Sequence, residues 1–155
     1  MAVTPSYRYA VSLRIRHPTW PAVKVSEILG LVPDRTWDVG APRQTARGMP
    51  LEGTNADSYW THSFGTFEDA NLEGYLDSTL DDLSTKAGAF GLIAETGGTA
   101  ELFVGLFLEQ WNTGYSISAG MHQRLASLGL ALSIDIYSFD GESSEVSKSV
   151  AGEQS

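Results

Sequence analysis

The sequence predicts an α+β fold in which helices pack on one face of a mostly antiparallel sheet. Two patterns lead to this prediction. Segments in which apolar and polar residues alternate, as in strands with one buried face, recur along the chain. Between them stand segments with apolar residues three and four positions apart, which is the spacing of an amphipathic helix. The 155 residues suffice for one domain, and a hydrophobic content of 42% supplies its core.

The first strand is predicted from Tyr7 to Ile15, where aromatic and branched residues occupy every second position. Arg8, Arg14 and Arg16 fall on the other face of this strand. Because charged side chains are rarely fully buried, only one face of the strand should be covered.

A short helix and a long connection are expected next. Val25, Ile28 and Leu29 have helical spacing, and Gly30 is suited to the left-handed position that ends a helix. From residue 31 to residue 57 no periodicity persists, and three Gly and three Pro residues interrupt the chain. A connection of this length without regular structure is usually functional or mobile.

In the middle of the chain, the sequence pattern predicts a strand, the main helix and a further strand. The strand runs from Tyr59 to Phe64. The helix carries one apolar stripe from Leu72 to Ala87, with its acidic residues mostly off the stripe and facing water. The strand from Thr99 to Leu108 is apolar on both faces, so we expect it to be covered on both sides.

A hairpin, a helix and a last strand complete the domain. The turn at residues 112–114 predicts a returning strand at 115–117, and Ser118 is a good N-cap for the next helix. The last strand is predicted at 130–137. From the second strand onward the order is βαββαβ, a ferredoxin-like core with an extra N-terminal βα unit before it. Residues 1–139 are expected to form a single domain, and the Gly/Ser/Glu-rich residues 140–155 a disordered C-terminal tail.

Several landmarks together resemble a bacterial family of unknown function. The run ILGLVP at 28–33 leads to Trp37 and Gly40, Tyr59 and Trp60 follow, and SIDIY at 133–137 closes the domain. These positions are similar to the domain-of-unknown-function family 4279, over roughly residues 6–138. The family name implies no activity, so the resemblance supports the domain and assigns no catalytic residue.

Composition and charge exclude several classes of function. The chain has no cysteine, which excludes disulfides, thiolate nucleophiles and zinc sites built on sulfur. The formal net charge is −9, and residues 66–155 carry fourteen acidic and only three basic side chains. Such a surface repels phosphate backbones, so we expect no nucleic-acid partner. The absence of a signal peptide and of a membrane-length apolar run predicts a cytoplasmic protein with no membrane contact.

The residues that carry chemistry form no standard catalytic motif. His17, His62 and His122 have no ligand spacing, so neither a metal nor any other cofactor is predicted. There is no nucleophile elbow and no glycine-rich phosphate loop. The acidic residues of the main helix are typical of a solvated face rather than of a metal site.

One region stands out as a candidate ligand-binding site. Cationic, aromatic and acid–base side chains gather in and beside the long connection: Arg35, Trp37, Arg43, Arg47, Trp60 and His62. Guanidinium groups bind carboxylates and phosphates, and indole rings stack on flat ligands. The alternative is structural, with Trp37 and Trp60 fixing the loop to the sheet.

Two functions therefore remain open. The first is a non-enzymatic binding or protein-interaction module, whose partner is another protein or a small anionic ligand. The second is a small enzyme that acts on an anionic substrate through residues 35–62. The sequence shows no recognisable nucleophile with a paired general base, and this disfavours the enzyme. An exposed edge strand would also allow pairing across a two-fold axis, so the protein is expected to be a monomer or a homodimer.

Overall fold

The fold comes from a computed structural model that describes residues 4–141. In this part of the chain it contains four helices and two sheets. The elements follow in the order β1 (Tyr7–His17), α1 (Ala22–Leu29), β2 (Arg35–Trp37), β3 (Pro42–Gln44), β4 (Pro50–Thr54), β5 (Ser58–Phe67), α2 (Leu72–Ser84), α3 (Ala87–Glu95), β6 (Thr99–Leu108), α4 (Ala119–Ser127) and β7 (Leu130–Tyr137).

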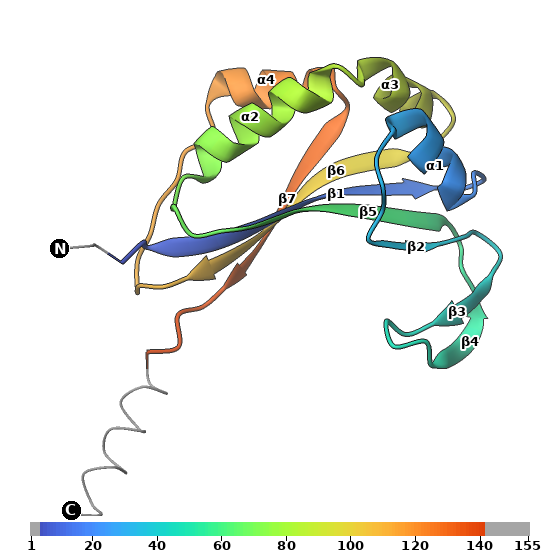
Figure 1. The fold of residues 1–155 in the computed structure, drawn as a ribbon, viewed down its shortest axis with the longest axis horizontal. Coiled ribbons are helices and arrows are strands. Elements are labelled where there is room, and N and C mark those ends of the chain that lie inside the picture. Colours follow the sequence, from blue (N-terminus) through green and yellow to red (C-terminus); the bar gives the residue numbers. More distant parts are fainter. Residues whose placement is uncertain (1–3, 142–155) are drawn as a thin grey trace, which may run out of the picture.

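The main sheet has the strand order β2-β5-β1-β6-β7 (Figure 1). The central strand β1 is antiparallel to both β5 and β6, and β2 is antiparallel to β5. Only β7 runs parallel to its neighbour β6, because α4 carries the chain back before β7 begins. The predicted α+β class with a mostly antiparallel sheet is therefore confirmed.

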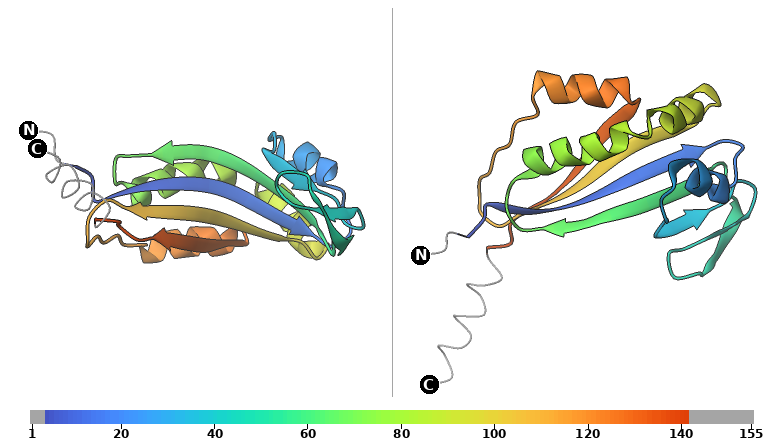
Figure 2. Two further views of the ribbon diagram at one scale, coloured as in Figure 1. Left: turned by 90° about the horizontal axis from the view of Figure 1, so that it is seen from below. Right: turned by 45° about the horizontal axis from the view of Figure 1, so that its top comes forward.

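The helices form a layer on one side of the main sheet (Figure 1). Along β1 every second side chain from Tyr7 to His17 is buried against this layer, while those between them are half-buried or exposed. The view from below shows the strands in front and the helices behind them (Figure 2). We call this uncovered side the open face; it carries the arginines that the sequence placed on the second face of β1.

The ends of the helices follow the expected local signals. Gly30 has a φ of 66°, the left-handed conformation that ends α1. The Ser118 side chain accepts a hydrogen bond from the Met121 amide and caps α4. The predicted apolar stripe of the main helix is buried from Leu72 to Leu83, but the chain turns at residues 85–86, so two helices stand where one was expected.

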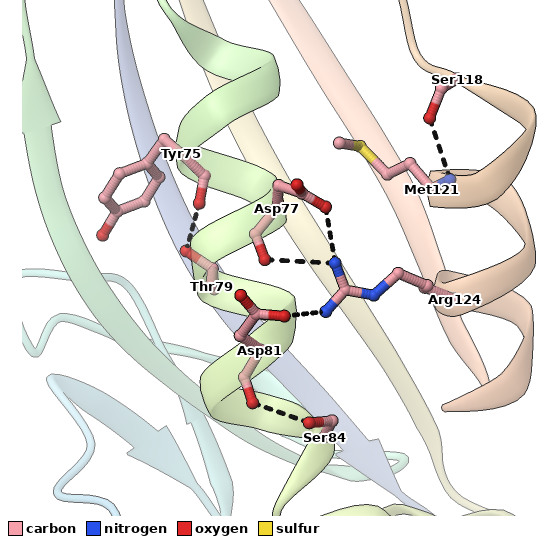
Figure 3. A network of polar contacts seen from close by, with 8 residues as sticks. All are labelled: Tyr75, Asp77, Thr79, Asp81, Ser84, Ser118, Met121 and Arg124. Atoms are coloured by element: carbon pink, nitrogen blue, oxygen red, sulfur yellow. Dashed lines mark hydrogen bonds and ion pairs between the residues drawn. The ribbon is translucent and has the colours of Figure 1, made fainter.

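Two ion pairs hold α4 to α2. Arg124 reaches from α4 to two carboxylates of α2, Asp77 and Asp81, and its Nη1 lies 2.5 Å from the Asp77 Oδ1 (Figure 3). These two acids were expected only to face water. Arg124 is half-buried but both carboxylates are largely exposed, so each pair adds little by itself, and together they hold α4 against α2.

The expected unstructured connection at 31–57 contains three short strands. β2 adds an edge to the main sheet, and β3 pairs with β4 in a separate hairpin. Strands of three to five residues are too short to show a period in the sequence, and every residue of β3 and β4 is exposed, so no apolar pattern marks them.

The ferredoxin-like order is not present in residues 4–141. The predicted strand at 115–117 does not form; these residues belong to an irregular link between β6 and α4, and Tyr115 and Ile117 pack against the core instead. The predicted extra N-terminal βα unit is part of the main fold, because β1 is the central strand. Of the predicted tail, residues 142–155 lie outside the described part of the chain. In the described part no helix is long and apolar enough to cross a membrane.

Candidate functional site

The open face of the main sheet holds a hollow with a floor of small side chains. Ala10 and Ser12 of β1 lie beside Gly105 of β6, and β-sheet register places Ala10 directly opposite Gly105. A Cβ atom added at Gly105 would lie 3.4 Å from the Phe107 ring. Because these residues are small, the neighbouring larger side chains stand above them and enclose about 270 Å³.

Aromatic rings form one wall of this open-face hollow. Phe107 of β6 and Tyr137 of β7 face each other in register, and their rings stack at 4.8 Å with an angle of 10°. Phe103 lies one step along the same face of β6 from Gly105. The wall offers flat apolar surface on a face that no helix of residues 4–141 covers.

Arg14 is the cation of the hollow. Its guanidinium carbon lies 3.4 Å from the centre of the Phe103 ring, so the ring holds one side of the group. The Arg14 Nε atom is buried and has no hydrogen-bond partner among residues 4–141. A buried N–H group without a partner carries a desolvation cost, which an acceptor placed in the hollow would remove.

The two other arginines of β1, Arg8 and Arg16, differ from Arg14 in that each has an acidic partner. Arg8 pairs with Glu109, and Arg16 pairs with Asp57 at 3.3 Å. Arg14, by contrast, forms no ion pair with the described residues.

Acidic side chains limit the charge that the hollow accepts. Asp34 lines it, and one of its carboxylate oxygens accepts a hydrogen bond from the Ser63 amide. Glu101 of β6 lies directly opposite Arg14 in register, and its carboxylate accepts a hydrogen bond from the Ser133 hydroxyl. Two carboxylates close to a single cation disfavour ligands with several negative charges.

Two of the sequence-predicted site residues, Arg35 and Trp37, lie on the open face. Strand register places Arg35 of β2 and Arg14 of β1 on either side of Thr61, so their Cα atoms are roughly 10 Å apart. Trp37 stacks on Tyr59 at 4.4 Å, and the Arg35 guanidinium lies 5.2 Å from the Trp37 ring.

Trp60 and His62 lie on the opposite, helix-facing side of the sheet. Trp60 is 1% exposed, and its indole N–H donates to the Ser26 hydroxyl of α1 at 2.9 Å. His62 is half-buried, and its Nδ1 donates to the Val32 carbonyl at 2.6 Å. Both side chains fix α1 and the following loop to the sheet.

Arg43 and Arg47 lie on the β3–β4 hairpin. Arg43 donates to the Glu52 carbonyl across the hairpin at 3.2 Å, and Arg47 stands exposed in the turn between the strands. A second hollow, of about 380 Å³, lies between β2 and this hairpin and is lined by Arg35, Trp37 and Gln44, among others, but not by Arg43 or Arg47. The three arginines of the long connection therefore do not converge on one site.

The polar groups of the second hollow already serve the fold. Asp38 accepts a hydrogen bond from the Ala22 amide at the start of α1, and the Asn55 side chain donates to the Asp38 carbonyl. These bonds attach the hairpin to α1. The open-face hollow, with its unpartnered Arg14 N–H group, is the stronger candidate for a ligand.

Sequence reasoning missed Arg14 and the rings beside it. The alternation along β1 did place Arg14 on an uncovered face, which was the signal available. The strand at 99–108 was expected to be covered on both sides, and this was wrong, because Phe103 and Phe107 are only half-buried on the open face. Their pairing with Arg14 and Tyr137 depends on strand register, which the sequence did not reveal.

Comparison with known proteins gives one match. The model of the family described as "Domain of unknown function (DUF4279)" matches residues 6–139, which confirms the resemblance seen in the sequence. Searches of curated proteins and of solved structures give no match.

Proposed function

We propose that this chain, which belongs to the DUF4279 family, is a binding module that takes a small monocarboxylate ligand in the open-face hollow. The observation that carries the proposal is Arg14, whose guanidinium rests on Phe103 and whose buried Nε–H has no partner among residues 4–141. A carboxylate is the natural acceptor, since charge-assisted hydrogen bonds to guanidinium are among the strongest in proteins.

The surroundings of Arg14 indicate the rest of the ligand. The stacked rings of Phe107 and Tyr137 favour a flat or apolar portion. Asp34 and Glu101 disfavour a second negative charge, so a single carboxylate attached to a ring suits the hollow better than citrate or phosphate.

A binding role agrees better with the geometry than an enzyme that works through residues 35–62. The six candidate residues of that region lie on three separate surfaces: the open face, the helix-facing side and the hairpin. In the open-face hollow, Asp34 is occupied by the Ser63 amide rather than by a hydroxyl that it would activate.

The proposal is tested by NMR of the Arg14 Nε–H group during titration with benzoate, hexanoate, citrate and phosphate at constant ionic strength. Benzoate has nine non-hydrogen atoms; at roughly 0.3 kcal/mol per atom its dissociation constant is of the order of 10 mM. We expect benzoate to shift the Arg14 signal saturably, and citrate and phosphate to bind more weakly.

Arg14→Met and Arg47→Met form a matched pair of variants. Both lose one positive charge and keep an unbranched stem, but only Arg14 lines the hollow. Arg14→Met should weaken benzoate binding at least tenfold, because a hydrogen bond to a charged group contributes roughly 1.5–3 kcal/mol. Because the variant lacks the Arg14 signal, its benzoate affinity is measured from the chemical shifts of the backbone amides around Gly105. Equal binding by both variants, or no saturable shift with any carboxylate, would overturn the proposal.

A further inference from the structure

The strand β7 has a free edge. It pairs with β6 on one side only, and no strand within residues 4–141 pairs with its other side. The opposite edge of the sheet is β2, which has only three residues. A free edge of eight residues exposes a row of backbone donors and acceptors that another strand can bind.

The usual protections of an edge strand are absent from β7. Its sequence, LALSIDIY, contains no proline and no lysine, and Asp135 is its only charge. Its register with β6 runs without a bulge from Leu130 to Tyr137. Natural proteins use prolines, lysines and bulges to prevent other strands from pairing with a sheet edge. An edge without them suggests that a partner strand covers it.

Apolar side chains of β7 are left partly uncovered. Ile136 is 59% exposed although it lies on the helix-facing side, and Tyr137 is 49% exposed on the open face. Leu132 and Ile134 are only half-buried. The helix layer therefore does not cover the whole length of the strand.

The sequence of β7 is complementary to itself in an antiparallel register centred on Ile134. On the helix-facing side, this register places Ile134 opposite Ile134 of a second copy and Leu132 opposite Ile136. On the open face, the large Tyr137 lies opposite the small Ala131. A register centred on Asp135 would place two carboxylates opposite each other, which is unfavourable.

We propose that β7 pairs with β7 of a second copy of this chain, antiparallel and about a two-fold axis at Ile134. The pairing joins the two main sheets into one continuous sheet and places the two open faces on the same side. A second copy is the partner that fits, because this register leaves no like charges opposite each other and brings both exposed apolar side chains into the contact. The inference does not depend on the proposed ligand.

The net charge of the chain predicts how the dimer responds to salt. Two copies with a formal charge of −9 repel each other, whereas the β7 contact itself is mainly apolar. Screening reduces the repulsion over roughly 8–10 Å at ordinary ionic strength. Added sodium chloride should therefore strengthen the dimer.

Sedimentation of the full chain over about 10–500 µM, in low and high salt, measures the association. Ile136→Lys places a charge in the contact. The control, Val23→Lys, also replaces a branched apolar residue by lysine, but at a 62% exposed site on α1. We expect Ile136→Lys to weaken the dimer at least tenfold and Val23→Lys to leave it unchanged. A monomer at the highest concentration and salt, or equal association of both variants, overturns the proposal.

The absence of natural cysteine allows a direct test of register. In the Ile134-centred pairing, Ile134→Cys brings two thiols directly opposite each other, within the Cα separation of about 4.4–6.8 Å that a disulfide needs. Ser133→Cys and Asp135→Cys place their two thiols on a diagonal, at greater separation. Mild oxidation should therefore link Ile134→Cys dimers fastest. Faster linkage of either neighbouring variant would contradict this register.

Discussion

His17 is the one histidine among residues 4–141 that is fully buried, and its contacts determine its protonation state. Its Nδ1 accepts hydrogen bonds from the amides of Thr19 and Trp20, so the ring proton is on Nε2 and donates to the Thr96 hydroxyl at 2.8 Å. The ring also stacks on Trp20 at 4.2 Å. The neutral ring satisfies all of these contacts; a second proton on Nδ1 would break two of them.

Burial, and to a lesser degree the charge of Lys24, lowers the pKa of His17 below its ordinary value of 6.5. Below that pH the unfolded chain therefore binds a proton more readily than the folded chain. The free energy of unfolding should fall as the pH drops below 6.5 towards the pKa of the folded state, and this part of the pH dependence should be absent above 6.5.

Denaturant unfolding of the natural chain and of His17→Asn at a series of pH values measures the contribution of His17 to this pH dependence. The Asn side-chain oxygen can still accept hydrogen bonds from the two amides. The variant should be less stable at neutral pH but should lose less stability on acidification than the natural chain. His122→Asn, at an exposed position on α4, is the control and should retain the natural slope. A parallel slope in His17→Asn would show that other groups cause the acid sensitivity.

At the scale of single elements, two helical glycines are expected to respond differently to alanine. Gly91 of α3 has no atom within 4 Å of an added Cβ, whereas a Cβ at Gly74 of α2 would lie 2.5 Å from the Asn71 side chain that caps this helix. Gly91→Ala should stabilise the fold by about 0.5–1 kcal/mol, because alanine restricts the unfolded chain. Gly74→Ala should give no gain, because it displaces a cap that contributes about 1 kcal/mol.

Thermal unfolding of the two variants distinguishes these effects. For a chain of this length, 1 kcal/mol corresponds to a change of about 2–4 °C in Tm. We expect Tm to rise by about 2 °C in Gly91→Ala and to stay level or fall in Gly74→Ala. A similar rise in both variants would mean that the Asn71 cap contributes nothing measurable.

Elements with a long buried stripe could be predicted from the sequence, and elements without one could not. The alternation of β1 and the stripe from Leu72 to Leu83 were identified because burial imposes a period. β3 and β4 bury nothing, so no such constraint acts on their residues. The apolar residues at 115–117 suggested a strand, but packing against the core also requires apolar residues without requiring a strand.

At the scale of the whole molecule, strand order decides which residues meet, and the sequence did not reveal it. Placing β1 at the centre brings Arg14 beside Phe103 of a strand almost ninety positions later. The candidate site predicted from chain proximity, at 35–62, is divided between the two faces of the sheet because successive residues of a strand point to opposite sides. Side chains that are close in sequence are thereby separated, while the hollow is assembled mainly from β1, β5, β6 and β7.

An aromatic contact beyond β7 bears on where the chain can be shortened. Phe139 packs edge-to-face on Trp111 at 5.1 Å, beyond the end of β7. The sequence from residue 142 onward has no periodic apolar positions. A chain that ends after Gly141 should therefore keep its Tm within about 2 °C, whereas one that ends after Tyr137 should lose about 2–4 °C, because an aromatic pair contributes roughly 0.5–1.5 kcal/mol.

Scanning calorimetry of both truncations, with Phe139→Ala in the full chain as control, tests the boundary. A large loss on removing only residues 142–155 would place the end of the domain beyond residue 141.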